Sequence, residues 1–523
     1  MLGRAGWLAL TSGSLAVAQS DVRDQRTGNW TTISCEHPMM VNAENFTGAE
    51  RWGVLDADHA WADILTAWRT AFYTDMGLDF QTAVFHQLST YSGTSCGKAW
   101  AVGGCKQVMS CEDRFDWSGA ASSLIMNSFV VVHTMFSHLF NALADLANAD
   151  LRNFGVDFGI LSDTETKSTD GEIARIAPVL LDMIPLASLV ALAPTFNISI
   201  DQNPYFTPSP AVRKSIVMEI LSVMAPIVQE RMKSTNASDN VWGWTYTQDI
   251  QRGYLNPLYV HHAWQNLTSD AGVALFSGSE DSIKHLTNLI SDGKMLALNR
   301  STDNPRGDLI PETPASGRAR RDAVLRGMYA FGIPAGWTAN SAGVFVFESG
   351  IDCGSKDRLP LMSDFINIPS TVMTQETANA TASCHNGKMY FLVSANRNGQ
   401  AFSAPKGIEK LDTDQYGKLS RHDIIQGAIR TYESNGNKNG APKINPTDPA
   451  MLSTIYDEGV LTPRYIRLAV CGGDEVARNR GSNGYSTYPC DRVGQENGGL
   501  SSFGTLGRGV WWSALMGSLF WIL

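Results

Sequence analysis

Eight cysteines constrain the fold of this chain more than any other feature, because they fall into two groups far apart in the sequence. Four lie before residue 112 and four after residue 352: Cys35, Cys96, Cys105, Cys111, Cys353, Cys384, Cys471 and Cys490. An even number of cysteines in an oxidising compartment predicts disulfides, so we expect two bridges in each half. Cys353 with Cys384 and Cys471 with Cys490 are the simplest local pairs. Eight cysteines allow about a hundred connectivities, and the sequence leaves the map open.

The same cysteines do not have the spacing of a metal site. No two of them form a C-x-x-C pair, and the interval from Cys105 to Cys111 is too wide for one zinc knuckle. His133 and His138 are five residues apart and diverge on a helix, so they do not form a metal pair. We therefore predict no metal ligand and no cofactor.

The oxidising compartment is itself predicted from the N-terminus. Residues 1–18 have the pattern of a secretory signal peptide: Arg4 supplies a positive charge, residues 6–17 are moderately apolar, and Ala16-Val17-Ala18 offers a small-x-small cleavage site. The prediction is a secreted protein from which this segment has been removed.

The C-terminus predicts a lipid anchor. Three small residues, Asn497-Gly498-Gly499, precede a polar spacer over 500–509 and an apolar tail over 510–523. This order is typical of a glycosylphosphatidylinositol (GPI) attachment signal, in which residues 497–523 are recognised and Asn497 receives the anchor. The alternative is a buried C-terminal helix. We expect a cell-surface protein, GPI-anchored to the plasma membrane or the cell wall, whose contact with the membrane is this anchor.

Composition agrees with a secreted glycoprotein. Seven Asn-x-Ser/Thr sequons predict N-glycosylation, at Asn29, Asn45, Asn197, Asn236, Asn266, Asn299 and Asn379. The net charge of −10 and the isoelectric point near 5.5 leave no basic stripe for phosphates, so we predict no nucleic-acid partner.

Hydrophobic periodicity predicts a mainly helical domain over residues 19–300. Apolar residues recur at spacings of three and four over 50–70, as one amphipathic helix or two short ones, and again over 120–146 and 212–232. Residues 176–194 are almost wholly apolar but contain Asp182 and prolines. We interpret this stretch as a buried core hairpin; the alternative is a membrane-active element over 176–232.

A linker over residues 301–321 separates this domain from a smaller one over 322–496. The linker is rich in proline and glycine and ends in Arg318-Ala319-Arg320-Arg321, which is either a dibasic processing site or a solvated helix start. Beyond it, residues 343–348, 388–394 and 465–471 predict strands and residues 424–432 a helix. The predicted fold class is α+β: a largely helical N-terminal domain followed by a smaller mixed, disulfide-bonded domain.

Catalytic motifs are weak throughout. Residues 93–97 match the G-x-S-x-G elbow of hydrolases, but no strand precedes them and Cys96 predicts a disulfide loop. Residues 412–423 imitate a calcium loop, except that Tyr416 stands where an oxygen ligand is needed; a turn that caps the helix beginning near Asp423 is the preferred interpretation. No alternating acidic strand of a glycosidase is present. We predict no catalytic residue and no enzyme.

Short blocks along the chain resemble the region downstream of the catalytic domain in fungal killer-toxin-like chitinases. The resemblance runs from about residue 35 to residue 490. Its residues, in chain order, are Cys35-Glu36-His37-Pro38, Ala49-Glu50-Arg51-Trp52, Asp56-Ala57-Asp58, Trp61, Asp63, Cys96, Cys105, Cys111, Asn127-Ser128-Phe129, His133, Gly332-Ile333-Pro334, Trp337, Asp352-Cys353, Asp423-Ile424-Ile425, Thr431-Tyr432, Asn435-Gly436, Thr462-Pro463, Cys471 and Tyr488-Pro489-Cys490.

This resemblance implies an accessory rather than a catalytic role. Killer-toxin-like chitinases carry family-18 catalysis on a separate barrel marked by a D-G-x-D-x-D-x-E strand, which this chain lacks. The expectation is therefore a non-catalytic fungal surface glycoprotein that acts by binding, with cell-wall polysaccharide as the partner. Three alternatives stay open: a membrane-active, toxin-like module using residues 176–232, an unrecognised carbohydrate-active enzyme, and a fragment of a chitinase gene whose barrel is missing.

Overall fold

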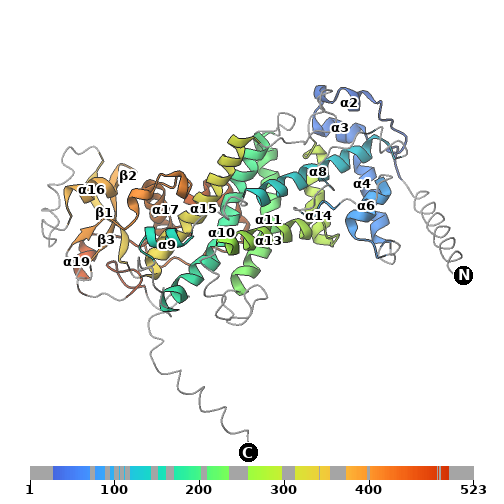
Figure 1. The fold of residues 1–523 in the computed structure, drawn as a ribbon. Coiled ribbons are helices and arrows are strands. Elements are labelled where there is room, and N and C mark those ends of the chain that lie inside the picture. The colour runs from blue at the N-terminus through green and yellow to red at the C-terminus, as the bar shows by residue number, and fades with distance from the viewer. Residues whose placement is uncertain are drawn as a thin grey trace, which may run out of the picture. The chain divides into compact units, whose positions relative to one another are not determined.

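The fold is available as a computed structural model of the whole chain (Figure 1). It describes residues 27–70, 73, 77–88, 95–98, 105, 111, 118–142, 151–160, 170–201, 209–234, 257–296, 313–340, 342–353, 373–396, 401–479, 481 and 485–493. Helices dominate these residues, and one small mixed sheet accompanies them, so the predicted α+β class is confirmed.

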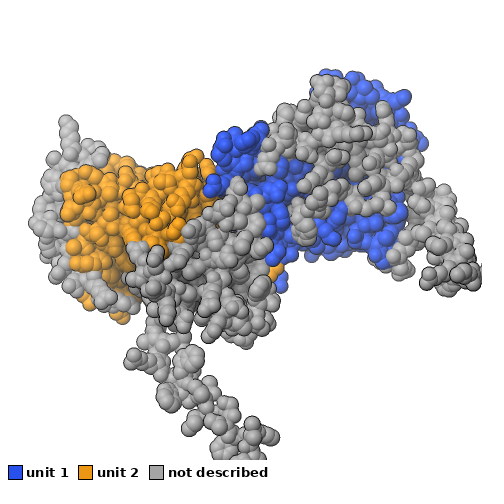
Figure 2. Space-filling model, in the orientation of Figure 1, with its two compact units in different colours: residues 1–146, 192–230, 261–321 blue, residues 147–191, 231–260, 322–523 orange. Residues whose placement is uncertain are grey.

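The chain forms two compact units, coloured separately in Figure 2. Unit 1 comprises residues 1–146, 192–230 and 261–321, and unit 2 comprises residues 147–191, 231–260 and 322–523. Neither unit is continuous in the sequence, whereas we expected two continuous domains over 19–300 and 322–496. Periodicity identifies helices but not which distant segments pack together, so the sequence offered no signal for this interleaving.

Unit 1 is built from helices. The predicted pattern over 50–70 forms two short helices, α3 (Gly48–Val54) and α4 (Ala57–Arg69), and the long predicted helix is α8 (Gly119–Asn141). A capping box between Thr47 and Glu50 begins α3 by satisfying its free backbone N–H groups. The other described elements of unit 1 are α2 (Pro38–Val41), η1 (Ala43–Asn45), α6 (Phe80–Leu88), α14 (Glu280–Ile290) and η3 (Ser291–Gly293), with most of α11 (Pro210–Ser234) and α13 (Pro257–Leu275).

Helix α10 corrects the predicted hairpin. Residues 176–194, which we expected to turn back at their prolines, lie within one continuous helix, Asp170–Asp201. A proline removes one backbone hydrogen bond and bends a helix, and here that loss is offset by burial. From Leu186 to Ala193 every side chain is at most 3% exposed. The buried Ser188 hydroxyl also donates to the carbonyl of Pro185 at 2.5 Å.

Helix α15 (Pro314–Ala339) includes the end of the predicted linker. Residues 314–321 are helical, and Arg320 is fully buried within them. A protease needs an accessible, extended segment, so the dibasic run is not presented as a cleavage site. Its alternative, a helix start, agrees with the structure, although Arg320 is not solvated.

Unit 2 contains a five-stranded sheet with the order β2-β3-β1-β5, and β4 pairs with β3. The strands are β1 (Val344–Asp352), β2 (Ala382–His385), β3 (Lys388–Ala395), β4 (Phe402–Ser403) and β5 (Val470–Gly472). Pairing is antiparallel except between β1 and β5. The strand predicted over 465–471 is shorter in the structure, where β5 begins only at Val470.

The helices of unit 2 lie before, between and after these strands in the sequence. They are α9 (Leu151–Asp157), α16 (Gln375–Thr381), η5 (Ile408–Lys410), η6 (Asp414–Tyr416), α17 (Arg421–Ser434), α18 (Pro449–Glu458), η7 (Gly459–Leu461) and α19 (Gly473–Arg478), with part of α10 and most of α15. Helix α17 begins at a capping box in which Ser420 and Asp423 satisfy each other's backbone N–H groups.

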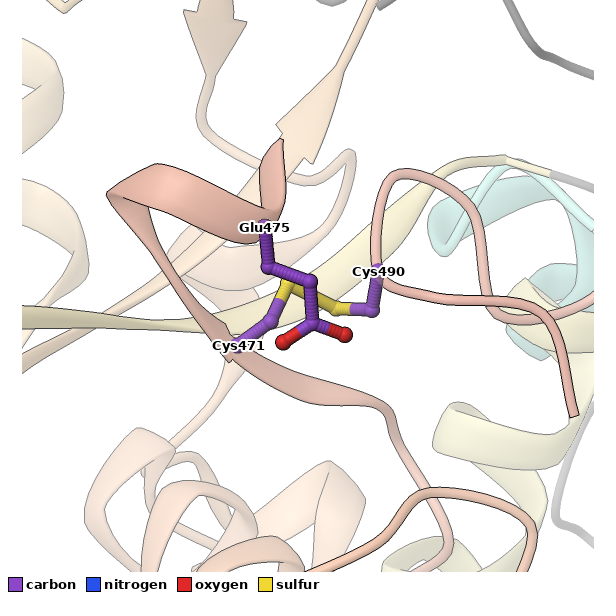
Figure 3. A group of neighbouring side chains, drawn as sticks. All are labelled: Cys471, Glu475 and Cys490. Carbon is purple, nitrogen blue, oxygen red and sulfur yellow. A yellow bond between two sulfur atoms is a disulfide. The ribbon is translucent and has the colours of Figure 1, made fainter. Parts of the chain in front are cut away.

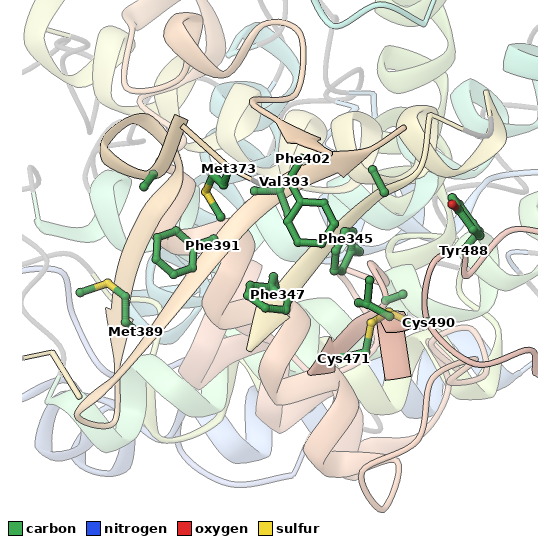
Figure 4. Close-up of a cluster of buried hydrophobic side chains, with 14 of the residues drawn as sticks. Phe345, Phe347, Met373, Met389, Phe391, Val393, Phe402, Cys471, Tyr488 and Cys490 are labelled. Atoms are coloured by element: carbon green, nitrogen blue, oxygen red, sulfur yellow. A yellow bond between two sulfur atoms is a disulfide. The ribbon is translucent and has the colours of Figure 1, made fainter. Parts of the chain in front are cut away.

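Alternation along the strands gives the sheet two different faces. Phe345, Phe347, Phe391 and Val393 point to one face and join a buried cluster with Phe402 (Figure 4). Side chains with the opposite parity point to the other face, because successive residues of a strand alternate. Helix α17 packs on the strands and contributes nothing to that cluster, so it covers the other face.

One described helix, Gly119–Asn141, is long and apolar enough to cross a membrane by length and composition. Of its most apolar window, 83% is buried inside the protein. Core helices pass the same test, so its composition carries no argument for insertion.

Candidate functional site

The cysteines pair as expected, with two disulfides in each half. The bonds join Cys35 to Cys111, Cys96 to Cys105, Cys353 to Cys384 and Cys471 to Cys490. Both local pairs predicted for the second half are present. The half-cystine Cys96, which follows the serine of the G-x-S-x-G match, is 2% exposed, and its carbonyl oxygen lies 2.9 Å from Nδ1 of the buried His133. The described residues of that loop are therefore held to α8 through Cys96.

In the calcium-like loop over residues 412–423, side chains form hydrogen bonds with other residues of the same chain. Asp423 accepts from Ser420 at 2.9 Å and from Arg326 at 2.7 Å, so both of its oxygens are engaged. Tyr416 is fully buried, and its hydroxyl donates to Asp157 at 2.5 Å. The interpretation as a turn that caps α17 agrees with this geometry.

The acidic motif of the N-terminal half fastens the chain before α2 to helix α4. Asp63 accepts from the backbone and hydroxyl of Thr27 and from the Trp30 indole, at 2.6 to 2.8 Å. Asp58 accepts from the Trp52 indole at 2.6 Å. Because these carboxylates satisfy buried tryptophan donors, this part of the family-like pattern has a structural role.

A different set of polar residues gathers at one end of the sheet in unit 2, on the face that α17 covers. Glu348 of β1 stands directly opposite Tyr390 of β3, which in turn stands opposite Ser383 of β2. Directly opposed residues project from the same face of a sheet. Glu433 and Tyr432, at the end of α17, complete what we call the tyrosine–carboxylate cluster: Glu348, Tyr390, Tyr432 and Glu433.

Electrostatic effects connect these residues. Burial raises the pKa of Tyr390, and the negative charges of Glu348 and Glu433 raise it further. Burial likewise raises the pKa of Tyr432, together with the charges of Glu475, Glu348 and Asp491. Glu348 therefore lies close enough to act on both tyrosines, and each phenol stays protonated and able to donate.

Two histidines border the cluster. The rings of His385 and Tyr390 meet edge to face, with centroids 6.3 Å apart. Burial lowers the pKa of His385, and the nearby charges of His422 and Arg430 lower it further against the opposing effect of Glu433. His385 is therefore neutral at neutral pH and offers one donor and one acceptor.

Ser383 and His422 form a hydrogen-bonded pair beside the cluster, with Oγ and Nδ1 2.7 Å apart. A serine–histidine pair becomes a nucleophile when a third group orients the histidine and donors stabilise an oxyanion. Within the described residues no carboxylate is bonded to His422, and Ser383 lies inside an edge strand rather than at a sharp turn. The pair ties β2 to α17 and does not supply this machinery.

One group in the described part of the chain has the composition of a metal site: Cys471, Glu475 and Cys490. Figure 3 shows that the two sulfurs are bonded to each other, with the Glu475 carboxylate beside them. Disulfide sulfur is not the thiolate that metals need, so the group does not bind a metal. Burial raises the pKa of Glu475 against a hydrogen bond from the backbone of Asp491.

The sequons differ in exposure. Asn29, Asn45, Asn266 and Asn379 are exposed, whereas Asn197 is half-buried in α10 and its Oδ1 is buried. Asn236, Asn299, the signal segment 1–18 and the anchor segment with Asn497 lie outside the described residues.

We expect glycans at Asn266 and Asn379 and none at Asn197. A glycan is added as the chain enters the secretory pathway, and one on Asn197 would prevent α10 from packing as it does. Mass spectrometry of peptides from the secreted protein, with and without glycosidase treatment, measures occupancy at all three positions in one sample. An occupied Asn197 in folded protein would contradict the packing described for α10.

The fold and this cluster define a disulfide-bonded α+β protein with a polar surface at the end of its sheet. Two fungal proteins of Penicillium expansum are similar to the chain. One, named probable chitinase LysM18, is 26% identical over 528 residues, which cover 93% of this chain and 35% of the relative. The other, named secreted chitinase LysM12, is 23% identical over 522 residues, covering 89% of this chain and 33% of the relative.

The chain is therefore distantly homologous, over most of its length, to fungal chitinases. It spans about a third of the length of the relatives it matches. No protein-family profile matches the chain, and no solved structure matches it. The tyrosine–carboxylate cluster was not predicted, because strand pairing brings residues 348 and 390 together and the packing of α17 on the sheet adds residue 432, whereas the three are far apart in sequence.

Proposed function

We propose that this chain is a secreted, non-catalytic protein that binds a polysaccharide of the fungal cell wall. It would correspond to the accessory region that follows the barrel in killer-toxin-like chitinases, and be held at the cell surface by the anchor expected at Asn497. The observation that carries the proposal is the extent of the similarity, over 93% and 89% of this chain, to proteins whose names give them action on chitin. Chitin is accordingly the first ligand to test.

A carbohydrate-active enzyme is the second candidate, and one observation favours it. Burial raises the pKa of Glu475, which lies beside Asp491, and two neighbouring carboxyl groups supply the acid and base of glycosidases. Against this, Asp491 is already bonded to Arg478 at 3.2 Å and to Asn479 at 2.8 Å, and its own backbone donates to Glu475. These contacts engage both carboxyl groups within the protein, so binding remains the preferred function.

We expect the purified chain to be retained on insoluble chitin without releasing sugar from it. Sedimentation of the protein with chitin, β-glucan and mannan measures retention, and reducing-sugar assays on the same samples measure hydrolysis. Reduced and alkylated protein is the control, because it keeps the charge of the chain but loses the disulfide-bonded fold. Recovery of native protein in the supernatant for all three polymers would sink the binding function, and sugar release would favour the enzyme.

A further inference from the structure

The disulfide between Cys353 and Cys384 is more open to solvent than the other three. The structure describes all eight half-cystines, and among them Cys384 alone is exposed. Cys35 and Cys111, bonded to each other, are half-buried, as is Cys353. The remaining four are buried, two of them inside the cluster of Figure 4: Cys96, Cys105, Cys471 and Cys490. An external thiolate must reach a disulfide sulfur in order to exchange with it, so access favours attack at Cys384.

The place of Cys384 in the sheet explains its exposure. Cys384 lies in β2, which among the described strands pairs only with β3, and it stands directly opposite Met389. Directly opposed residues project from the same face of a sheet, so Cys384 lies beside the buried cluster to which Met389 belongs, at the edge strand. Cys353, by contrast, packs against that cluster. The two ends of this disulfide therefore differ in access: Cys384 lies at the edge of the sheet and Cys353 against its core.

Backbone contacts hold both cysteines in place independently of their disulfide. The backbone N–H of Cys353 donates to the carbonyl of Gly387 at 2.9 Å, and β2 pairs with β3 over residues 382–385. The chain just before β2 is held as well, because the Arg421 guanidinium donates to the carbonyl of Ala380 at 2.7 Å. If the disulfide opens, its two sulfurs therefore stay close to each other within a folded sheet, which favours closure of the same bond afterwards.

We propose that Cys353–Cys384 is a thiol-exchange site, at which an external thiol is captured on Cys384 and released by Cys353. The external thiolate attacks Sγ of Cys384, and a new disulfide forms there as the bond to Cys353 breaks. Cys353 leaves as a thiolate and takes up a proton from water, so the external sulfur is oxidised and the sulfur of Cys353 is reduced. In the reverse step Cys353 attacks Sγ of Cys384 and expels the external thiolate. Neither step needs another oxidant or reductant, and neither depends on the binding of a polysaccharide.

The test incubates the native full chain with reduced glutathione at neutral pH, blocks free thiols with N-ethylmaleimide after increasing times, and maps both groups by mass spectrometry of peptides. Glutathione should appear on Cys384 and maleimide on Cys353, at least about tenfold faster than either appears on the six other cysteines. Similar rates at all eight would show that exchange requires unfolding and would overturn the site. Glutathione on Cys353 in place of Cys384, or on neither, would overturn it as well.

Two double variants provide the controls. Cys353→Ser with Cys384→Ser should abolish the capture of glutathione and keep the circular dichroism spectrum of the folded protein, because backbone contacts still hold β2. Cys35→Ser with Cys111→Ser removes a half-buried disulfide and should leave capture at Cys384 unchanged. Capture of glutathione by the first variant as fast as by the native chain would overturn the assignment. If a variant does not fold, the time course on the native chain decides alone.

A second arm distinguishes a small thiol from a protein thiol as the external partner. A folded protein that bears one exposed cysteine takes the place of glutathione, and non-reducing gels detect the joined product. A product linked through Cys384 would support a site open to both kinds of thiol. Capture of glutathione without such a product would support a site for small thiols, and failure of both probes would overturn the site.

Discussion

Replacement of Gly417 by alanine should lower the free energy of unfolding by about 4 kcal/mol. Gly417 has φ of +64°, and a Cβ there would lie 2.3 Å from the backbone nitrogen of Arg326 and 2.6 Å from the carbonyl oxygen of Asp322. Those are backbone atoms of helix α15, which cannot move aside as a flexible side chain can. Denaturant unfolding followed by circular dichroism measures the loss.

Gly387 is the matched control for this substitution. It has φ of +78°, so alanine meets the same left-handed strain, but nothing lies within 4 Å of its Cβ position. Gly387→Ala should therefore lose about 1 kcal/mol, which is the conformational part alone. Equal losses at the two positions would show that α15 does not approach the loop as closely as described.

The same glycine explains why a calcium loop was suggested by the sequence. Gly417 occupies the position at which such loops need a sharp turn, and the structure does turn sharply there. The turn serves contact with α15 and the cap of α17, and Lys418, the next residue, bonds to Asp322 at 3.0 Å. A local pattern thus predicted the backbone shape correctly, while the reason for that shape lay almost a hundred residues away.

Other features were likewise predicted where they depend on residues close in sequence, and missed where they depend on distant contacts. The disulfides Cys353–Cys384 and Cys471–Cys490 were predicted because their partners are close in sequence, and α17 because its apolar spacing and cap are local. Helix α10 was missed because its prolines signal a break, whereas burial of the surrounding side chains decides the outcome. The tyrosine–carboxylate cluster was missed because the register of β1 with β3 places Glu348 against Tyr390. The spacing of residues in the sequence does not predict which residues of the two strands pair.

Asp157 should be the carboxylate whose replacement most alters stability in unit 2. It accepts from Tyr416 at 2.5 Å and from Lys410 at 2.7 Å, and Tyr416 is fully buried between the rings of Phe158 and Tyr329. Asp157→Asn removes the charge from both bonds but keeps the shape. We expect a loss of about 2 kcal/mol in the free energy of unfolding near neutral pH, since hydrogen bonds to a charged group are the strong ones.

The pH dependence of this loss distinguishes lost charge from lost packing. Burial raises the pKa of Asp157, but the bonds from Lys410 and Tyr416 and the nearby positive charges outweigh it, so the pKa lies below its ordinary value. A carboxyl whose pKa falls on folding stabilises the protein fully above its unfolded pKa, and this stabilisation is lost as the pH falls through the folded value. Native protein and Asp157→Asn should therefore differ by a constant amount above about pH 5, and converge only as the pH falls below the ordinary titration range of an aspartate.

Tyr416→Phe provides the comparison, because it removes the buried hydroxyl and leaves the ion pair between Asp157 and Lys410 in place. Its loss should be smaller, about 1 kcal/mol, and should shrink less on acidification, since the remaining pair still holds the pKa of Asp157 down. Unfolding curves recorded at a series of pH values measure the free energy of unfolding of all three proteins under the same conditions. A difference between native protein and Asp157→Asn that stays constant down to the lowest pH would mean that packing, and not the charge of Asp157, holds this part of the fold.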